Sequence, residues 1–177
     1  MIDLITETKL AIELEKKGYD LYFKVAAKTS NPLAASTMSS LADRELLHIE
    51  RIRSFYLDMT GEKKLPSDWL KGVEVSPTKE ELLLPIFNKL KLNLNKKFET
   101  QADISESYVI AEGLERDSYH LYDKLSKGST NEIAKKFFAA LAIEEREHYS
   151  ILEDTLLYLN DPGEWYRLQE RWIVEGG

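Results

Sequence analysis

Two segments of the sequence carry a glutamate and a histidine three residues apart on an otherwise apolar helical pattern. In LADRELLHIERI they are Glu45 and His48, and in LAIEEREHYSIL they are Glu145 and His148. On an α-helix this spacing turns a carboxylate and an imidazole to one face, where both can bind one metal ion or bridge two. A lone Glu-x-x-His pair is usually solvated, but its repetition in apolar surroundings indicates metal coordination.

Two further glutamates are isolated charges on apolar helical faces. Within about 60° of Glu15 on a helical projection, the side chains are small, apolar or aromatic: Thr8, Ala11, Ile12, Gly18, Tyr19, Tyr22 and Ala26. Glu115 has the same setting 100 residues later, beside Tyr119 and Tyr122. Carboxylates on such faces are expected to point into the protein interior.

The four glutamates should also meet at one height. Glu15 and Glu45 lie about equally far from the turn between their helices, roughly 22 Å at 1.5 Å per residue. The same holds for Glu115 and Glu145 about a second turn. Uncompensated carboxylates in an apolar interior each cost several kcal/mol, and the sequence places no lysine or arginine on these inner faces. Two divalent cations would balance four carboxylates, and two imidazoles would complete the coordination.

The elements that position these residues arise from a duplication. When the chain is shifted by 100 residues, 14 of the 47 positions from 11 to 57 are identical to those from 111 to 157. Ordinary composition would give only about three identities. The matches include all four glutamates and both histidines described above. The chain is therefore expected to contain two related helix hairpins.

Turn signals divide the chain into long helical patterns. They are the segments TSNP, TGEKKLPSD, GST and NDPG. Between them the periodicity predicts an all-α fold, a four-helix bundle with one long crossover and a short C-terminal helix. In this single domain we expect hairpins at 5–60 and 103–160, a crossover at 61–102 and the last helix at 162–172.

Composition narrows the classes of partner. The 177 residues carry a net charge of −7, which disfavours nucleic acid and anionic membranes as partners. There is no cysteine, so disulfides and thiolate metal sites are excluded and hard or borderline metals such as iron and manganese are favoured. Without a membrane-length apolar run or an apolar leader, a cytoplasmic protein is expected.

The pattern resembles the rubrerythrin branch of the ferritin-like superfamily over nearly the whole chain. The residues that carry the resemblance are Glu15 with Tyr22, Glu45 with His48, Glu115 with Tyr122, Glu145 with His148, and the closing DPGEWYRLQERWIVEGG. The resemblance implies a ferritin-like fold and two iron ions per chain, with manganese or zinc as substitutes. It also implies that Glu45 and Glu145 bridge the metals and that Glu15 and Glu115 are terminal ligands.

The chain departs from rubrerythrins in two ways. Full rubrerythrins carry a rubredoxin domain with a cysteine-ligated iron, so this cysteine-free chain would need an external electron donor such as a rubredoxin-type protein. Rubrerythrins also carry an extra glutamate one turn after the third-helix ligand, where this chain has Ser118; Glu112 is only a weak substitute. Tyr22 and Tyr122 are either hydrogen-bond donors to ligand carboxylates or core tyrosines with some other acceptor.

Three functions fit the sequence. The first is a di-iron oxidoreductase that reduces hydrogen peroxide or dioxygen, with a role in oxidative stress or iron handling. The second is a ferroxidase-like protein that stores or scavenges metal, and the third is a structural metal site such as zinc. The long helices and the outward-facing Leu46 and Leu47 favour a homodimer.

Overall fold

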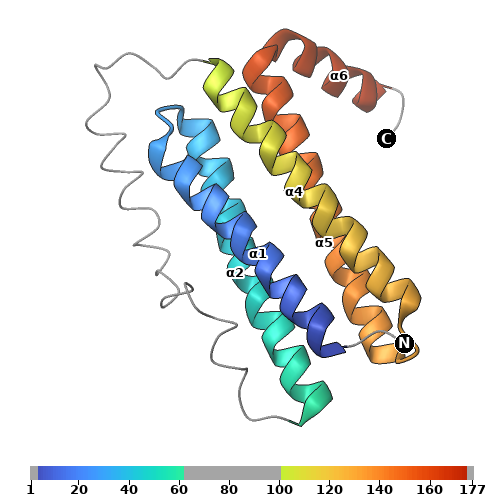
Figure 1. Ribbon diagram of the computed structural model, residues 1–177. Coiled ribbons are helices and arrows are strands. Elements are labelled where there is room, and N and C mark those ends of the chain that lie inside the picture. The colour runs from blue at the N-terminus through green and yellow to red at the C-terminus, as the bar shows by residue number, and fades with distance from the viewer. Residues whose placement is uncertain (1–3, 62–100, 175–177) are drawn as a thin grey trace.

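The computed structural model describes residues 4–61 and 101–174, and all of its regular elements there are helices (Figure 1). They are α1 (Leu4–Lys28), α2 (Pro32–Thr60), α4 (Gln101–Gly128), α5 (Glu132–Asn160) and α6 (Pro162–Val174). The predicted all-α bundle is confirmed. The single domain and the crossover at 61–102 stay predictions, because all but the ends of that segment lies outside the described residues.

The four long helices form two antiparallel hairpins that pack side by side (Figure 1). α1 pairs with α2 and α4 pairs with α5, while α1 also contacts α4 and α2 also contacts α5. Each long helix thus borders one helix of its own hairpin and one of the other. α6 turns back at the end of α5 and packs against it.

Matching asparagines begin the second helix of each hairpin. The Asn31 side chain accepts hydrogen bonds from the backbone N–H groups of Leu33 and Ala34, each at 3.0 Å. The Asn131 side chain accepts them from Ile133 and Ala134, at 2.8 and 3.1 Å. These bonds satisfy N–H groups that have no partner within the helix. The duplication therefore repeats the N-terminal cap as well as the charged residues.

The core consists of two apolar clusters separated along the bundle. One contains Ile52, Phe55 and Phe138 among its buried residues, and the other contains Met38 and Leu41. On every long helix, the predicted metal ligands fall between the residues of these two clusters in the sequence. The polar centre is therefore closed by apolar packing at both ends.

Two predictions from the sequence concern the outer surface of the bundle: that it does not cross a membrane and that it forms a homodimer. No helix in the described part of the chain is long and apolar enough to cross a membrane. Leu47 has 57% of its surface exposed, and Leu46 is half-buried. The homodimer remains a prediction.

Candidate metal centre

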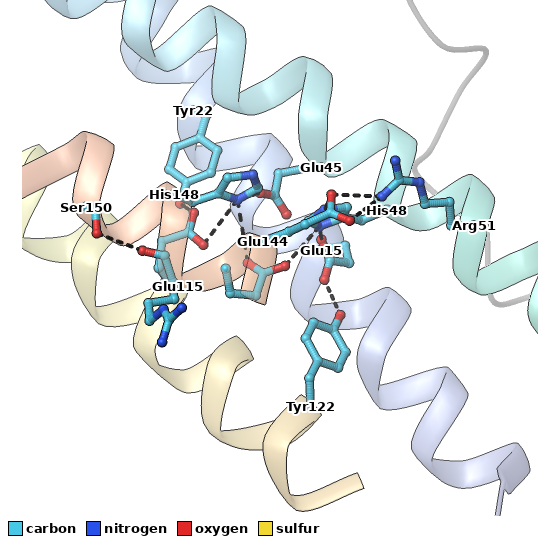
Figure 2. A network of polar contacts seen from close by, with 12 residues as sticks. Glu15, Tyr22, Glu45, His48, Arg51, Glu115, Tyr122, Glu144, His148 and Ser150 are labelled. Carbon is cyan, nitrogen blue, oxygen red and sulfur yellow. Dashed lines mark hydrogen bonds and ion pairs between the residues drawn. The ribbon is translucent and has the colours of Figure 1, made fainter. Parts of the chain in front are cut away.

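The structure brings all six predicted metal ligands into one buried volume, and Figure 2 shows Glu15, Glu45, His48, Glu115 and His148 gathered there. Each of the six residues has at most 3% of its surface exposed: Glu15, Glu45, His48, Glu115, Glu145 and His148. α1 and α4 contribute one glutamate each, while α2 and α5 contribute a glutamate and a histidine each. The predicted agreement in height and face is therefore observed in the folded chain.

His48 lies against carboxylates from both hairpins. Its Nδ1 atom is 3.1 Å from Glu15 Oε2 and 2.9 Å from Glu145 Oε1. Glu15 belongs to the same hairpin as His48, whereas Glu145 belongs to the other. One half of the centre thus combines a carboxylate from the hairpin of His48 with a carboxylate that reaches across from the other hairpin.

His148 has the matching arrangement. Its Nδ1 atom is 3.4 Å from Glu115 Oε2, within its own hairpin, and 3.3 Å from Glu45 Oε1, across the bundle. It also lies 3.6 Å from Glu145 Oε2. The two carboxylates that reach across, Glu45 and Glu145, are those that the resemblance assigns as bridges.

The donor atoms fit a metal ion in both spacing and chemistry. Glu45, His48, Glu145 and His148 each offer one ligand atom, and these atoms all lie within 4.8 Å of one another. Buried atoms that make no hydrogen bond with any described residue include Glu45 Oε1, Glu115 Oε2 and both ring nitrogens of His148. Buried polar atoms of this kind are expected to have a partner, and a cation bound between them would supply one.

Two tyrosines tie the hairpins together at the centre (Figure 2). The hydroxyl of Tyr22 on α1 donates a hydrogen bond to Glu115 Oε1 on α4, and the hydroxyl of Tyr122 on α4 donates one to Glu15 Oε1 on α1. Both tyrosines are fully buried. The sequence left open whether these tyrosines donate to ligand carboxylates or to some other acceptor. In the structure both donate to the glutamates predicted as terminal ligands, Glu115 and Glu15.

A comparison with known protein families agrees with this geometry. The family model described as rubrerythrin matches residues 8–156, which include all six predicted ligands and both tyrosines. The chain belongs to the rubrerythrin family. Comparison with curated proteins and with solved structures finds no significant match. Membership indicates a ferritin-like di-iron protein, and the buried Glu/His cluster is a site that can bind metal.

In this rubrerythrin-family chain, the cluster balances its charge internally when no metal is bound. Burial lowers the pKa values of the histidines, but hydrogen bonds to Glu145 and Glu15 raise that of His48 to about 11. The nearby carboxylates of Glu115 and Glu145 raise that of His148 to about 9 against the same effect. Imidazolium ions therefore offset the carboxylates, and a divalent cation must displace these protons to bind.

The carboxylates differ in how strongly they hold protons. Burial, followed by the charge of Glu15, raises the pKa of Glu45 well above its usual range. For Glu145, burial acts in the same direction, but the two histidines beside it, His148 and His48, prevail and lower its pKa. Burial, followed by the charge of the facing glutamate, raises the pKa of Tyr22 and Tyr122, so both hydroxyls remain donors.

Sequence reasoning missed one contact of the centre. The outer ring nitrogen of His48, Nε2, lies 3.1 Å from Glu144 Oε2. Arg51 Nη1 donates to both oxygens of the same carboxylate, at 2.6 and 2.7 Å. From the sequence alone, Glu144 resembles the other solvated glutamates of this helix. The only signal that it contacts the centre is its position directly before Glu145. Its contact with His48 depends on how α2 and α5 are rotated.

Ser118 and Glu112 are the two residues to compare with the extra glutamate of rubrerythrins. Ser118 is buried, at the position where the resemblance expects an extra glutamate. Glu112 is half-buried, and its charged neighbours are Glu153 and Arg116. Neither residue supplies an additional buried carboxylate.

Proposed function

We propose that this chain is a non-haem di-iron oxidoreductase that reduces hydrogen peroxide or dioxygen with electrons from an external donor. The observation that carries the proposal is the convergence of four buried glutamates and two buried histidines from four helices. The donor set of carboxylate oxygens and imidazole nitrogens suits iron, for which manganese or zinc are substitutes. Family membership supports the same reading.

The contacts suggest how the six residues would share two metal ions. His48 and Glu15 would hold one ion, and His148 and Glu115 the other, because each histidine faces the terminal glutamate of its own hairpin. Glu45 and Glu145 would bridge, since each faces the histidine of the opposite hairpin. Two divalent ions would neutralise four carboxylates in an interior that solvates charge poorly.

The protein's part in the reaction is to position groups and exclude water. When bound, an Fe(II) pair supplies the two electrons that cleave the O–O bond of hydrogen peroxide, and the external donor restores them. Tyr22 and Tyr122 hold the terminal carboxylates at fixed orientations. The apolar clusters on either side keep the centre away from bulk water and strengthen its electrostatic interactions.

A second function has its own supporting observation. Ser118 replaces the extra glutamate that the resemblance associates with changes in iron oxidation state. This replacement favours a ferroxidase-like protein that oxidises and stores or scavenges iron without peroxidase turnover. A structural metal site would use the same six ligands but would show no redox reaction.

Rapid mixing distinguishes these functions. Protein loaded anaerobically with Fe(II) is mixed with hydrogen peroxide or, in parallel, with dioxygen, and the near-ultraviolet absorbance of Fe(III) is followed. Faster oxidation by peroxide supports the peroxide reductase, and preference for dioxygen supports the ferroxidase or an oxidase. If neither oxidant reacts, the oxidoreductase proposal is wrong.

Metal stoichiometry tests the site independently of activity. Glu45→Ala and Glu145→Ala should each bind fewer than two metal ions per chain. Glu147→Ala, which removes an exposed glutamate from the same helix as Glu145, should still bind two. Two ions bound by either bridging variant would contradict the assignment of bridges.

A further inference from the structure

The two histidines of the centre have different surroundings on their outer side. His48 Nε2 lies 3.1 Å from Glu144 Oε2, and Arg51 holds that carboxylate through both of its oxygens. Figure 2 shows Glu144 between the His48 ring and the Arg51 side chain, at the edge of the cluster. Glu144 is 33% exposed and Arg51 is 52% exposed. This network therefore connects the buried ring to the protein surface.

His148 has no such support. Its Nε2 atom is buried and makes no hydrogen bond with any residue in the described part of the chain. The repeat explains the difference, because the position that matches Glu144 is Arg44 and the position that matches Arg51 is Ile151. The arginine side chain has no acceptor for an imidazole N–H. The isoleucine side chain has no charge and could not hold a carboxylate in place as Arg51 does. The duplicated halves have thus diverged at the residues that would orient the histidine.

We infer that the two halves of the centre are inequivalent. Glu144, held by Arg51, is a positioning residue for His48, and the half that contains His48 takes up a divalent cation before the half that contains His148. This inference rests on the proposed six-residue metal site. It adds the order in which the two halves bind a cation, and it assigns that order to Glu144 and Arg51.

The physical reason lies in the proton on the outer nitrogen. A metal-bound histidine usually donates its other N–H to a carboxylate or carbonyl, which fixes the tautomer and the orientation of the ring. With the outer N–H of His48 directed at Glu144, the Nδ1 lone pair faces Glu15 and Glu145, where the cation would lie. Binding through His148 Nδ1 leaves the outer N–H buried with no acceptor among residues 4–61 and 101–174, which opposes binding.

The order of filling can be observed directly with Zn(II), a diamagnetic probe. Metal-free protein labelled with ¹⁵N is titrated with Zn(II), and the ring ¹⁵N resonances of the two histidines are assigned with His48→Gln and His148→Gln. We expect the His48 resonances to change over the first equivalent and those of His148 over the second. If His148 responds first, or both respond together, the inference is wrong. If neither responds, the proposed metal site itself is wrong.

Variants test whether Glu144 sets the order. Glu144→Ala should weaken the first binding step by about 10- to 100-fold, whereas Glu147→Ala on the same helix should leave it unchanged. Glu144→Gln keeps a neutral acceptor and should recover part of the loss, and Arg51→Gln should weaken the step less than Glu144→Ala. Equal first-step affinities for Glu144→Ala and Glu147→Ala would overturn the assignment. Should the alanine variant not fold, the filling order of the unmodified protein still decides the inference.

Discussion

The hydroxyl of Tyr22 donates a hydrogen bond to Glu115, a residue of the opposite hairpin, and both side chains are buried. Tyr122 makes the reciprocal contact with Glu15. Because each bond joins α1 to α4, the pair orients the carboxylates of Glu115 and Glu15 and also fixes one hairpin relative to the other. The stability of the bundle and the geometry of the metal site therefore depend on the same two hydroxyl groups.

Removal of either hydroxyl should destabilise the metal-free protein. In Tyr22→Phe and Tyr122→Phe a buried carboxylate loses its donor, so the free energy of unfolding should fall by about 1–3 kcal/mol in each variant. Urea denaturation in the presence of a chelator measures this change. Tyr166→Phe, at a residue with 55% of its surface exposed, is the control and should lie within about 0.5 kcal/mol of the unmodified protein. Core variants as stable as this control would show that the bonds contribute nothing.

Gly18 should be required for the position of Glu45. A Cβ atom built on Gly18 would lie 3.2 Å from Cδ and Oε2 of Glu45, which is closer than an ordinary van der Waals contact. Gly18→Ala should therefore displace the carboxylate and weaken metal binding, by on the order of tenfold. Calorimetric titration with Zn(II) measures the affinity.

Gly113→Ala is the matched control for Gly18→Ala. Gly113 also lies inside a long helix, but a Cβ atom there would have no neighbour within 4 Å. Its replacement should leave metal affinity unchanged and raise the free energy of unfolding by about 0.5–1 kcal/mol, because glycine is a poor helix former. Equal metal affinities for the two alanine variants would argue against a close approach by Glu45.

The stability of the metal-free protein should fall as pH rises above neutrality. The pKa of His148 is raised from 6.5 to about 9, and that of His48 to about 11. The folded state therefore holds more protons than the unfolded state in this range. The stabilisation is complete below about pH 6.5 and is lost as pH rises through the raised pKa values. Urea denaturation at pH 6.5 and pH 9 should show the loss, and His148→Gln should reduce it.

Metal binding should respond to pH in the opposite direction. A cation must displace protons from His48 and His148, so apparent affinity should increase between pH 6.5 and pH 9. Competition with a chelator of known pH dependence measures this. A stability of the metal-free protein that rose over the same range would contradict the assigned charge balance.

The two asparagine caps should contribute independently. Asn31→Ala and Asn131→Ala each remove an acceptor that serves two backbone N–H groups, so each should cost about 0.5–2 kcal/mol of unfolding free energy. The two costs should add, because the caps lie on different hairpins. Asn→Asp at either position keeps the acceptor and should retain most of the stability.

The sequence predicts the helices well because their signals are local. Asn31 and Asn131 mark helix starts, and the apolar periodicity runs on to Thr60 and Asn160, where α2 and α5 end. The six candidate ligands could also be identified from the sequence, since a glutamate on an apolar helical face is recognisable within a single helix. The duplication then excluded coincidence as the reason for the Glu-x-x-His pairs.

Contacts between hairpins could not be predicted in the same way. The acceptor of Tyr22 lies 93 residues away, and so does the carboxylate that Arg51 holds. Such contacts depend on the rotation and spacing of packed helices, which periodicity along one helix does not define. For this reason Glu144 remained indistinguishable from neighbouring surface glutamates until the fold placed it beside His48.

The crosswise sharing of the centre bears on how such a chain could have evolved. One hairpin carries three of the six candidate ligands and one of the two tyrosines, and its carboxylate reaches the histidine of the other. Two identical copies of an ancestral hairpin, related by a two-fold axis, would thus have completed the centre as a dimer. In such a dimer every substitution occurs twice. Fusion of the copies would have removed that constraint, and the chain now has an arginine at position 44 where the matching position 144 has a glutamate.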